Sequence, residues 1–360
     1  MDNKRPEAMV RINTPELAEE IIASGKADYV LMGRQWIADE EWANKARAGR
    51  ADDIRTCIRC NNCYHIATEH FNTCCTVNPR VYRENRVPLT LPRAQTARSV
   101  VVVGGGPAGL KAALTAAQRG HQVTLVEQSG ALGGLMIPAS VGAFKEDLRR
   151  YLSYLRRQVE KSQIHVMLHT RADRALLEHL HPDAVILAVG GRAVMPPVPG
   201  LGTSGAVQAV ALLNAGLETA GTRVTILGGG SIGCELALEL AALDRMVTVV
   251  ELRDKLAANG NELYRQDLML HLEQETRITI LTQTVCTGVT AQGCTVREKD
   301  GGTRVIPHDT FVIAAGLRAD ADAVEALYGV VPETYYVGDC KRAASITEAT
   351  TEAYFLGASL

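Results

Sequence analysis

The chain has 360 residues, of which 46% are hydrophobic and 22% are charged, and its formal net charge at pH 7 is −2. This length predicts roughly two to three domains with buried cores. The near-neutral charge, without a clustered basic face, gives no indication of a nucleic-acid partner. No apolar run approaches the roughly 18 residues that a membrane helix requires, so we expect no membrane association.

The number and the spacing of the cysteines indicate the redox compartment of the protein. Nine cysteines occur, and five of them fall between Cys57 and Cys75. An odd number with this clustering favours metal ligation in a reducing compartment over a framework of disulfides. The first residues lack the apolar stretch of a secretory signal, and we therefore expect a cytoplasmic protein.

Residues 1–50 are predicted to hold a helix, a short strand and a second helix. The first helix begins after Thr14, which with the following proline forms a typical helix start. The strand covers residues 29–32 and ends in Gly33-Arg34, and a polar helix follows over residues 39–48. Because this segment is too small to bury a core of its own, we expect it to pack on another part of the chain.

Residues 51–97 contain a cysteine motif and end in a linker with two prolines. Cys57, Cys60 and Cys63 form a C-x2-C-x2-C pattern, and Cys74 and Cys75 are both candidates for a fourth ligand. Three thiolates in one compact loop, completed by a more distant fourth, are typical of a [4Fe-4S] cluster.

Zinc is the alternative metal for this loop. Structural zinc sites more often use two separated C-x2-C knuckles, or one knuckle with a pair of histidines. His65 and His70 follow the motif and keep a zinc site open as the alternative. The polar neighbours of the cysteines, among them Arg59 and Asn61, disfavour a role as simple buried thiols.

A strand, a glycine-rich turn, a helix and a second strand follow over residues 99–127. Continuous valines predict a buried parallel strand, which leads directly into a turn that fits G-x-G-x-x-G. The residues of this turn are Gly104, Gly105, Gly106, Pro107, Ala108 and Gly109. The second strand ends in Glu127, at a spacing from Gly104 close to that of dinucleotide-binding β-α-β units. The helix N-terminus would bind a pyrophosphate, and Glu127 would accept hydrogen bonds from ribose hydroxyls.

The second half of the chain contains a near-copy of this unit over residues 222–251. Its turn consists of Gly228, Gly229, Gly230, Ser231, Ile232 and Gly233, and its second strand ends in Glu251 at the same spacing. Chance rarely repeats a whole strand–glycine–helix–acid unit, so we predict two nucleotide-binding domains. Glu251 favours NAD over NADP, because a carboxylate repels a 2′-phosphate, while Arg253 and Lys255 leave NADP as an alternative.

Three further strands end in glycine-containing turns, over residues 184–191 and 311–316 and at Gly338-Asp339. This order predicts an α/β fold with two Rossmann-like domains, one of them inserted in the other.

Together these motifs resemble the 2,4-dienoyl-CoA reductase / trimethylamine dehydrogenase family. The resemblance rests on C-x2-C-x2-C, on Cys75-Thr76-Val77-Asn78-Pro79 and on the GGGPAGL turn that follows. Members of this family are old-yellow-enzyme-type flavoproteins, in which an N-terminal TIM barrel carries FMN and the substrate site. A [4Fe-4S] cluster follows the barrel, and then an FAD or ADP domain with an inserted NAD(P)H domain.

The resemblance extends from Arg11 to the last residue and implies a cofactor for each motif. Cys57, Cys60, Cys63 and Cys75 match the cluster ligands, while Gly33 and Arg34 match contacts of the FMN phosphate. The residues implied for FAD are Gly104, Gly106, Pro107, Ala108, Gly109, Glu127, Gly134, Gly190, Gly338 and Asp339. Those implied for NAD(H) are Gly228, Gly230, Ser231, Ile232, Gly233 and Glu251.

Most of the family's barrel has no counterpart here. The sequence begins near the family's seventh barrel strand, so that nearly all FMN contacts and the acid residues that serve the enoyl substrate are missing. The glycine that the family places before the Arg11-Ile12 pair is Val10 in this chain. We place the barrel remnant at residues 1–50 and the cluster segment with its linker at 51–97. The FAD-binding domain is placed at 98–205 and 305–360, and the NAD(P)H-binding domain at 206–304.

Disulfide reduction is not expected of such a chain. Flavoproteins that reduce disulfides carry a closely spaced cysteine pair beside the flavin, and no C-x2-C or C-x4-C occurs within residues 98–360. The cysteines of this region are isolated in the sequence and are predicted to be packing residues: Cys234, Cys286, Cys294 and Cys340.

The resemblance implies an NAD(P)H-oxidising flavoprotein in which FAD takes a hydride and single electrons pass to the cluster. FMN is expected only if a barrel is supplied, and no residue is assigned a catalytic role. Two alternatives stay open. The chain could pair with a separate TIM-barrel flavoprotein chain as an enoyl reductase, or it could be an inactive remnant that holds FAD or ADP.

Overall fold

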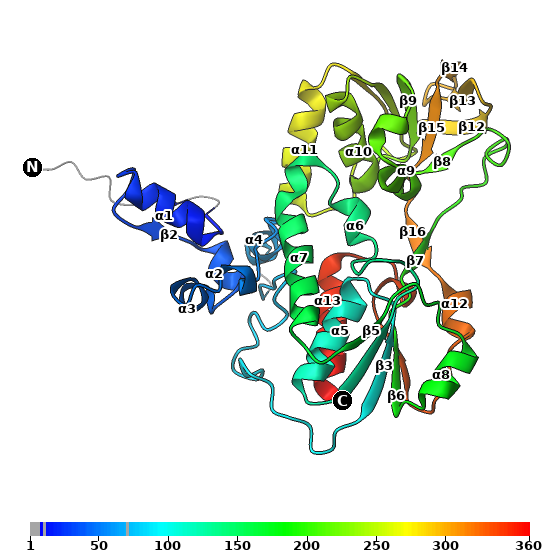
Figure 1. Cartoon of the computed structure of the whole chain (residues 1–360). Coiled ribbons are helices and arrows are strands. Elements are labelled where there is room, and N and C mark those ends of the chain that lie inside the picture. The colour runs from blue at the N-terminus through cyan, green and yellow to red at the C-terminus, as the bar shows by residue number, and fades with distance from the viewer. Residues whose placement is uncertain (1–7, 10–11, 70–71) are drawn as a thin grey trace, which may run out of the picture. The chain divides into compact units, whose positions relative to one another are not determined.

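The structure is a computed structural model that describes residues 8–9, 12–69 and 72–360, with only the backbone described for residues 8 and 9. The chain forms two compact units (Figure 1). The first comprises the described residues up to Ser140 together with Lys145–Gly191 and Ala319–Leu360, and the second comprises Val141–Phe144 and Arg192–Arg318. Within these described ranges, no helix is both long and apolar enough to cross a membrane.

The first unit begins with a short strand–helix–strand element. β1 (Ala8–Met9) pairs in parallel with β2 (Val30–Leu31), and α1 (Pro15–Ala23) connects the two. As expected, Thr14 caps α1, since its hydroxyl accepts a hydrogen bond from the Leu17 N–H at 3.3 Å. Three residues used in the sequence argument, Val10, Arg11 and His70, lie outside the described residues.

The helix predicted over residues 39–48 is shorter, and another helix precedes it. α2 (Arg34–Ala38) starts directly after Gly33, and α3 (Trp42–Arg47) follows. The chain cannot stay helical between them, because Asp39 is extended and its carboxylate accepts a hydrogen bond from the Glu41 N–H. After α4 (Asn62–Thr68) the described residues form no further helix or strand until Ser99.

The main sheet of the first unit is parallel, in the order β17-β6-β3-β4-β5. Its strands are β3 (Ser99–Val103), β4 (Gln122–Val126), β5 (His165–Met167), β6 (Ala184–Leu187) and β17 (Thr334–Tyr336). The valines of β3 alternate between the two faces of this sheet: Val100 and Val102 lie in one core, and Val101 and Val103 in the other.

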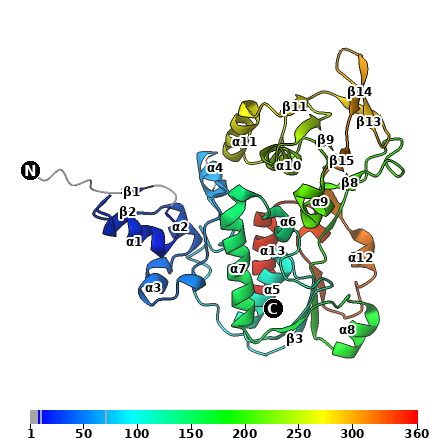
Figure 2. The same cartoon turned by 45° about the horizontal axis from the view of Figure 1, so that its top comes forward.

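Helices cover both faces of the first sheet (Figures 1 and 2). The face of Val100 packs on α5 (Pro107–Gln118), α7 (Glu146–Glu160) and α13 (Ile346–Ser359). The opposite face packs on α8 (Arg174–Leu180) and α12 (Ala321–Glu325). A short α6 (Met136–Ala139) precedes α7.

The second unit repeats the parallel sheet, in the order β11-β10-β9-β15-β8. Its strands are β8 (Val207–Gln208), β9 (Arg223–Leu227), β10 (Met246–Val250), β11 (Ile278–Leu281) and β15 (Thr310–Ile313). One face carries α9 (Ala209–Ala215), α10 (Ser231–Ala242) and α11 (Glu262–Gln274). The other carries an antiparallel sheet of β12 (Val285–Val289), β13 (Gly293–Arg297) and β14 (Thr303–Pro307).

The α/β fold with two Rossmann-like parallel sheets is therefore confirmed. The second unit extends beyond the expected segment 206–304 on both sides, because β15 pairs with β9 and completes its sheet. The chain passes between the units through β7 (Gly191–Ala193) and β16 (Leu317–Ala319), which pair with each other. Short 3-10 turns cover Ala51–Asp53, Ala143–Lys145, Leu217–Thr219 and Gly338–Cys340.

Candidate cofactor sites

The first glycine turn joins β3 to α5 and is closely packed on one side. Gly104 has φ +106°, and a Cβ there would lie 2.3 Å from the Ala188 carbonyl oxygen. A Cβ on Gly109 would lie only 1.8 Å from the Gly104 carbonyl oxygen. The side of Gly106 is open, with its nearest neighbour, the Gly134 Cα, 3.9 Å from an added Cβ. The backbone can therefore approach a phosphate beside Gly106, at the N-terminus of α5.

Glu127 lies directly after β4 and holds this turn in place. Its Oε2 accepts a hydrogen bond of 2.6 Å from the Gly105 N–H, and its Oε1 accepts one of 2.7 Å from the Ser129 N–H. The side chain is buried. Because each carboxylate oxygen can accept more than one hydrogen bond, capacity remains for ribose hydroxyls.

Other predicted FAD residues gather around the same turn. A Cβ on Gly338 would lie 2.9 Å from the Ala108 Cβ, and one on Gly134 would lie 2.8 Å from the Gly106 Cα. Gly190 follows the end of β6 with φ +77° and has open space beside it. Asp339 is half-buried, and burial raises the pKa of its carboxyl. These residues follow the carboxyl ends of neighbouring parallel strands, which is where open α/β sheets bind ligands.

The second turn, between β9 and α10, has the same geometry. Cβ atoms on Gly228 and Gly233 would lie 2.4 Å from the Ala314 oxygen and 2.0 Å from the Gly228 oxygen, and the side of Gly230 is open. Glu251 Oε2 accepts a 2.6 Å hydrogen bond from the Gly229 N–H, as Glu127 does from the Gly105 N–H. The turn is thus a second place at which a helix N-terminus faces open space.

Arg253 and Lys255, the two cations for which NADP stayed open as an alternative, have hydrogen-bond or ion-pair partners within the chain. Arg253 Nη1 donates to Asn259 Oδ1 at 3.3 Å, and Lys255 Nζ lies 3.2 Å from Glu262 Oε2. Both side chains are exposed, and the Arg253 N–H donates to Glu251 Oε1 at 2.8 Å.

The predicted cluster ligands line one small cavity in the first unit. Its lining residues are Arg34, Cys57, Ile58, Cys60, Asn61, Cys63, Cys75, Thr76 and Val77. Cys74 is not among them, and its sulfur accepts a hydrogen bond of 3.3 Å from Asn62 Nδ2. Across the described ranges, no three His, Cys, Asp or Glu side chains are arranged to hold a single metal ion.

Burial sets the protonation of these thiols. It raises the pKa of Cys57 to about 11 and that of Cys75 to about 12, and the pKa of Cys63 is raised by burial as well. Burial outweighs the opposing effect of the Arg34 guanidinium on Cys57 and Cys63, so these thiols stay protonated at neutral pH, whereas a bound metal centre favours the thiolate.

Polar side chains whose contacts the sequence does not reveal position the cysteine loop. Gln35, in α2, accepts a hydrogen bond of 2.9 Å from the Cys57 N–H. Arg59 has φ +52° and forms an ion pair with Asp147, which also accepts a 2.8 Å hydrogen bond from Asn13 Nδ2. Asp147 lies in the first turn of α7, so that the N-terminal segment, the cysteine loop and α7 share one buried carboxylate.

A chain of hydroxyls links the cavity to α13. Thr76 Oγ1 lies 3.2 Å from Cys60 Sγ and 2.7 Å from Thr347 Oγ1, at the start of α13. Thr347 in turn accepts a 3.2 Å hydrogen bond from Asn62 Nδ2. No local motif marks these residues, because their contacts join parts of the chain more than 270 residues apart.

The predicted FMN-phosphate residues lie beside the cysteines. Gly33 is the N-cap of α2, with open space around it, and Arg34 donates a hydrogen bond from Nη1 to Asn61 Oδ1. Arg34 thus faces the cysteine loop.

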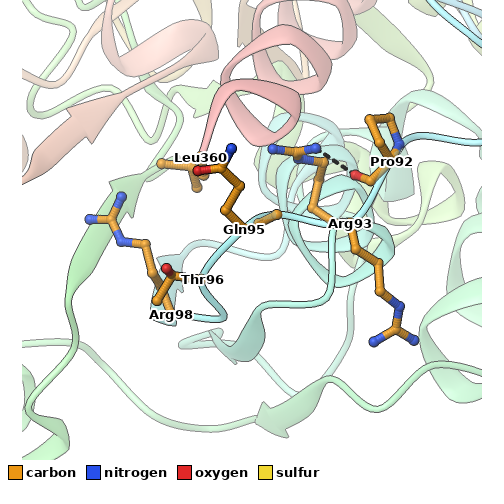
Figure 3. A pocket seen from close by; sticks show the side chains of 8 residues that line it. Pro92, Arg93, Gln95, Thr96, Arg98 and Leu360 are labelled. Atoms are coloured by element: carbon orange, nitrogen blue, oxygen red, sulfur yellow. Dashed lines mark hydrogen bonds between the residues drawn. The ribbon is translucent and has the colours of Figure 1, made fainter.

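A separate surface cavity lies at the opposite, amino ends of the strands (Figure 3). Its walls include Pro92, Arg93, Arg98, which precedes β3, and Arg119, which caps α5. Since the nucleotide turns follow the carboxyl ends of the strands, this cavity is not part of either turn.

These features define a class: an α/β oxidoreductase with two dinucleotide-binding domains, of the kind that binds a flavin and a nicotinamide nucleotide. Residues 98–353 match the family described as pyridine nucleotide-disulphide oxidoreductase. The chain belongs to this family.

Individual relatives also match the N-terminal segment. The chain is 34% identical over 347 residues to the bilirubin reductase of Mediterraneibacter gnavus, covering 96% of this chain and 53% of that protein. It is 37% identical over 312 residues to the NADH oxidase of Thermoanaerobacter brockii, covering 85% of this chain and 47% of that protein. The structure of a 2-naphthoyl-CoA reductase complex superposes with a TM-score of 0.92 at 29% identity, over 98% of this chain and 54% of that chain.

The chain thus spans about half the length of the curated relatives it matches. The family and these relatives place it among the flavin- and NADH-linked oxidoreductases.

The packing role predicted for two cysteines of the second unit is confirmed. Cys286 and Cys294 are buried in its core, on the paired strands β12 and β13. The pairing depends on strand register, which spacing along the sequence does not reveal.

Proposed function

We propose that the chain is the NAD(P)H-oxidising half of an iron–sulfur flavoprotein of the 2,4-dienoyl-CoA reductase / trimethylamine dehydrogenase type. The observation that carries the proposal is the cavity lined by Cys57, Cys60, Cys63 and Cys75, in the same unit as the first glycine turn. Two nucleotide-binding domains alone have no use for four thiols around one cavity. The cavity therefore favours onward electron transfer over an inert nucleotide-binding remnant.

The residues of the first turn fit FAD. The N–H groups at the start of α5 face the open side of Gly106, where the pyrophosphate would bind. Glu127 would accept hydrogen bonds from the ribose, and Gly338-Asp339 lies against Ala108 of the turn. Bound FAD would supply the redox chemistry, accepting a hydride from NAD(P)H and releasing electrons singly.

The second turn fits a nicotinamide dinucleotide by the same argument. Gly230 leaves the approach to α10 open, and Glu251 lies at the end of β10 for the ribose hydroxyls. A carboxylate here disfavours a 2′-phosphate, so NADH is the proposed donor.

The cysteine cavity fits a [4Fe-4S] cluster. Such a cluster takes one thiolate at each of four corners, so its ligands surround a volume instead of converging on one ion. Cys75 lines the cavity and Cys74 does not, which supports Cys75 as the fourth ligand. The chain's own contribution is to hold the loop through Gln35 and Asp147 and to offer a hydroxyl of Thr76 to the Cys60 sulfur.

The second candidate function of this chain is that of one part of a larger enoyl-type reductase. It is favoured by the half-length match to the relatives, whose names include a 2-naphthoyl-CoA reductase. In that case a TIM-barrel flavoprotein, in the same or another chain, would supply FMN and the substrate site, with Gly33 and Arg34 as phosphate contacts. The cytoplasm is the proposed compartment in either case, because buried free thiols suit a reducing environment.

Anaerobic purification with cofactor analysis tests the proposal. We expect bound FAD together with iron and acid-labile sulfide, and NADH-driven reduction of a one-electron dye without added FMN. The matched pair Cys75→Ser and Cys74→Ser separates the ligand from its neighbour: only the first should lose iron. A chain that retains neither iron nor flavin would contradict the proposal, and flavin without iron would leave a nucleotide-binding remnant.

A further inference from the structure

A permanently charged side chain lines the cysteine cavity. Among the described residues around that cavity, only Arg34 carries a fixed charge, and the others are the four cysteines and neutral side chains. Arg34 is the first residue of α2, directly after Gly33, and its side chain is half-buried. The start of this short helix thus brings a guanidinium to the wall of the cavity.

This guanidinium has no carboxylate partner. Its Nη1 donates a hydrogen bond to Oδ1 of Asn61, an uncharged amide, and within the described ranges no Asp or Glu oxygen lies within ion-pair distance of it. Arg59 of the cysteine loop differs, because it forms an ion pair with Asp147. The positive charge of Arg34 is therefore not cancelled by a neighbouring side chain.

The hydrogen bond to Asn61 fixes where this charge lies. Asn61 follows Cys60 and precedes α4, with a left-handed backbone of φ +58° that asparagine adopts more readily than most residues. Its side-chain oxygen holds the guanidinium beside the C-x2-C-x2-C motif. Burial raises the pKa of Cys57 and Cys63, and the guanidinium acts in the opposite direction on both thiols, as a nearby cation does.

We propose that Arg34 raises the reduction potential of the [4Fe-4S] cluster that this cavity fits. The inference rests on the proposed function, because it presupposes that cluster. Reduction adds one electron, and thus one negative charge, to a centre whose thiolate ligands are already negative, and no covalent bond forms or breaks. In the proposed function this electron comes from NADH through FAD. A cation at the wall of the cavity stabilises the added charge and so favours the reduced state.

This role is separate from the contact with an FMN phosphate that the family resemblance implies for Arg34. A phosphate contact requires FMN and a barrel. The effect on the cavity requires only Arg34, Asn61 and the cysteines, all of which belong to the first unit. The effect can therefore be measured on this chain without added FMN.

An anaerobic redox titration followed by electron paramagnetic resonance tests the proposal on the whole chain, purified with its own cofactors. Arg34→Gln removes the charge and keeps a side-chain amide donor. We expect the equilibrium constant for reduction to fall about tenfold, which lowers the potential by about 59 mV for a one-electron couple. Arg34→Lys keeps the charge and should restore most of the wild-type potential.

Two substitutions of Asn61 separate the charge from the hydrogen bond. Asn61→Asp has nearly the same shape but gives Arg34 a carboxylate partner, so the potential should fall as in Arg34→Gln. Asn61→Gly removes the hydrogen bond, tolerates the left-handed backbone and leaves the charge, so the potential should stay close to that of the wild type. A purely structural role of Arg34 predicts the reverse order, because only Asn61→Gly loses the contact.

The outcomes distinguish this inference from the proposed function on which it rests. A wild-type chain without a cluster signal overturns both. A cluster that titrates at the same potential in Arg34→Gln as in the wild type overturns this inference alone, as does an equal fall in Arg34→Gln and Arg34→Lys. If Arg34→Gln loses its iron, the comparison of Asn61→Asp with Asn61→Gly decides, and equal potentials in these two variants overturn the inference.

Discussion

Replacing Thr76 by valine removes one hydroxyl beside the proposed cluster and little else. Thr76 is buried, and valine has nearly the same shape. Its hydroxyl lies 3.2 Å from Cys60 Sγ. A thiolate has no proton to donate, so when Cys60 ligates iron the hydroxyl must donate to the sulfur. It then accepts from Thr347, which accepts from Asn62, so all three hydrogen bonds run in one direction.

The expected result is a more negative reduction potential. Hydrogen bonds to the sulfurs favour the reduced, more negatively charged cluster. If the lost bond distinguishes the two oxidation states by about 1 kcal/mol, the potential falls by roughly 40 mV for a one-electron couple. Global stability should fall by only about 1 kcal/mol, because Thr347 keeps its hydrogen bond from Asn62 and the Thr76 carbonyl keeps its 2.7 Å bond from Thr350.

An anaerobic redox titration followed by electron paramagnetic resonance measures this potential. Thr76→Ser should restore the wild-type value, because serine keeps the hydroxyl. Thr73→Val is the matched control: the Thr73 hydroxyl donates to the Cys63 carbonyl oxygen at 2.6 Å and not to a sulfur, so its loss should leave the potential unchanged. If the cluster of the Thr76→Val variant has the wild-type reduction potential, the reasoning is refuted. If the wild-type protein gives no electron paramagnetic resonance signal of a cluster, the cluster itself is refuted.

Three more predictions separate the sites. Gly109→Ala places a Cβ 1.8 Å from a backbone oxygen of the first turn and should abolish flavin binding, which flavin absorbance measures. Gly233→Ala places a Cβ 2.0 Å from a backbone oxygen of the second turn, so it should abolish NADH binding, measured by NADH titration, and leave the flavin bound. Glu251→Gln should weaken NADH binding by about 10-fold or more, through the loss of charge-assisted hydrogen bonds to the ribose, as measured by fluorescence titration. Asp147→Asn weakens the ion pair between the buried Asp147 carboxylate and the half-buried Arg59 of the cysteine loop, and should lower the free energy of unfolding by about 1–3 kcal/mol and reduce iron content. The control is Asp52→Asn, which removes an exposed ion pair with Arg157 and should change the free energy of unfolding by less than about 1 kcal/mol. Denaturant titration measures the free energy of unfolding of both variants.

Each of these predictions has an outcome that contradicts it. If Gly109→Ala and Gly233→Ala affect both nucleotides alike, the turns do not have separate ligands. An unchanged affinity for NADH in Glu251→Gln would remove the ribose role of that carboxylate. Equal losses of stability in Asp147→Asn and Asp52→Asn would show that the buried pair does not anchor the loop.

The nucleotide-binding units could be predicted because their signals are local. The valines of β3, the glycines of each turn and the acids Glu127 and Glu251 follow one another within a single β-α-β unit, and the structure gives each the expected strand, turn and helix. The inserted order of the domains also followed from the repeat, although the strand β15 that completes the second sheet could be placed there only by its pairing with β9.

The supporting residues could not be predicted in this way. Thr76 meets Thr347, and Arg59 meets Asp147, through contacts between distant parts of the chain that no spacing reveals. Cys286 and Cys294 lie on the paired strands β12 and β13, and which residues these strands place opposite each other depends on their register. Polar side chains at such positions become informative only once burial and partners are known.

The central claim is that electrons from NADH reach an iron–sulfur cluster within this chain. Electron paramagnetic resonance of the anaerobically purified protein, frozen before and after addition of NADH, tests it most directly. The account predicts a reduced-cluster signal that appears on addition of NADH, persists in Cys74→Ser and is missing in Cys75→Ser. A protein that contains FAD and consumes NADH but shows no such signal, with iron absent, would contradict it.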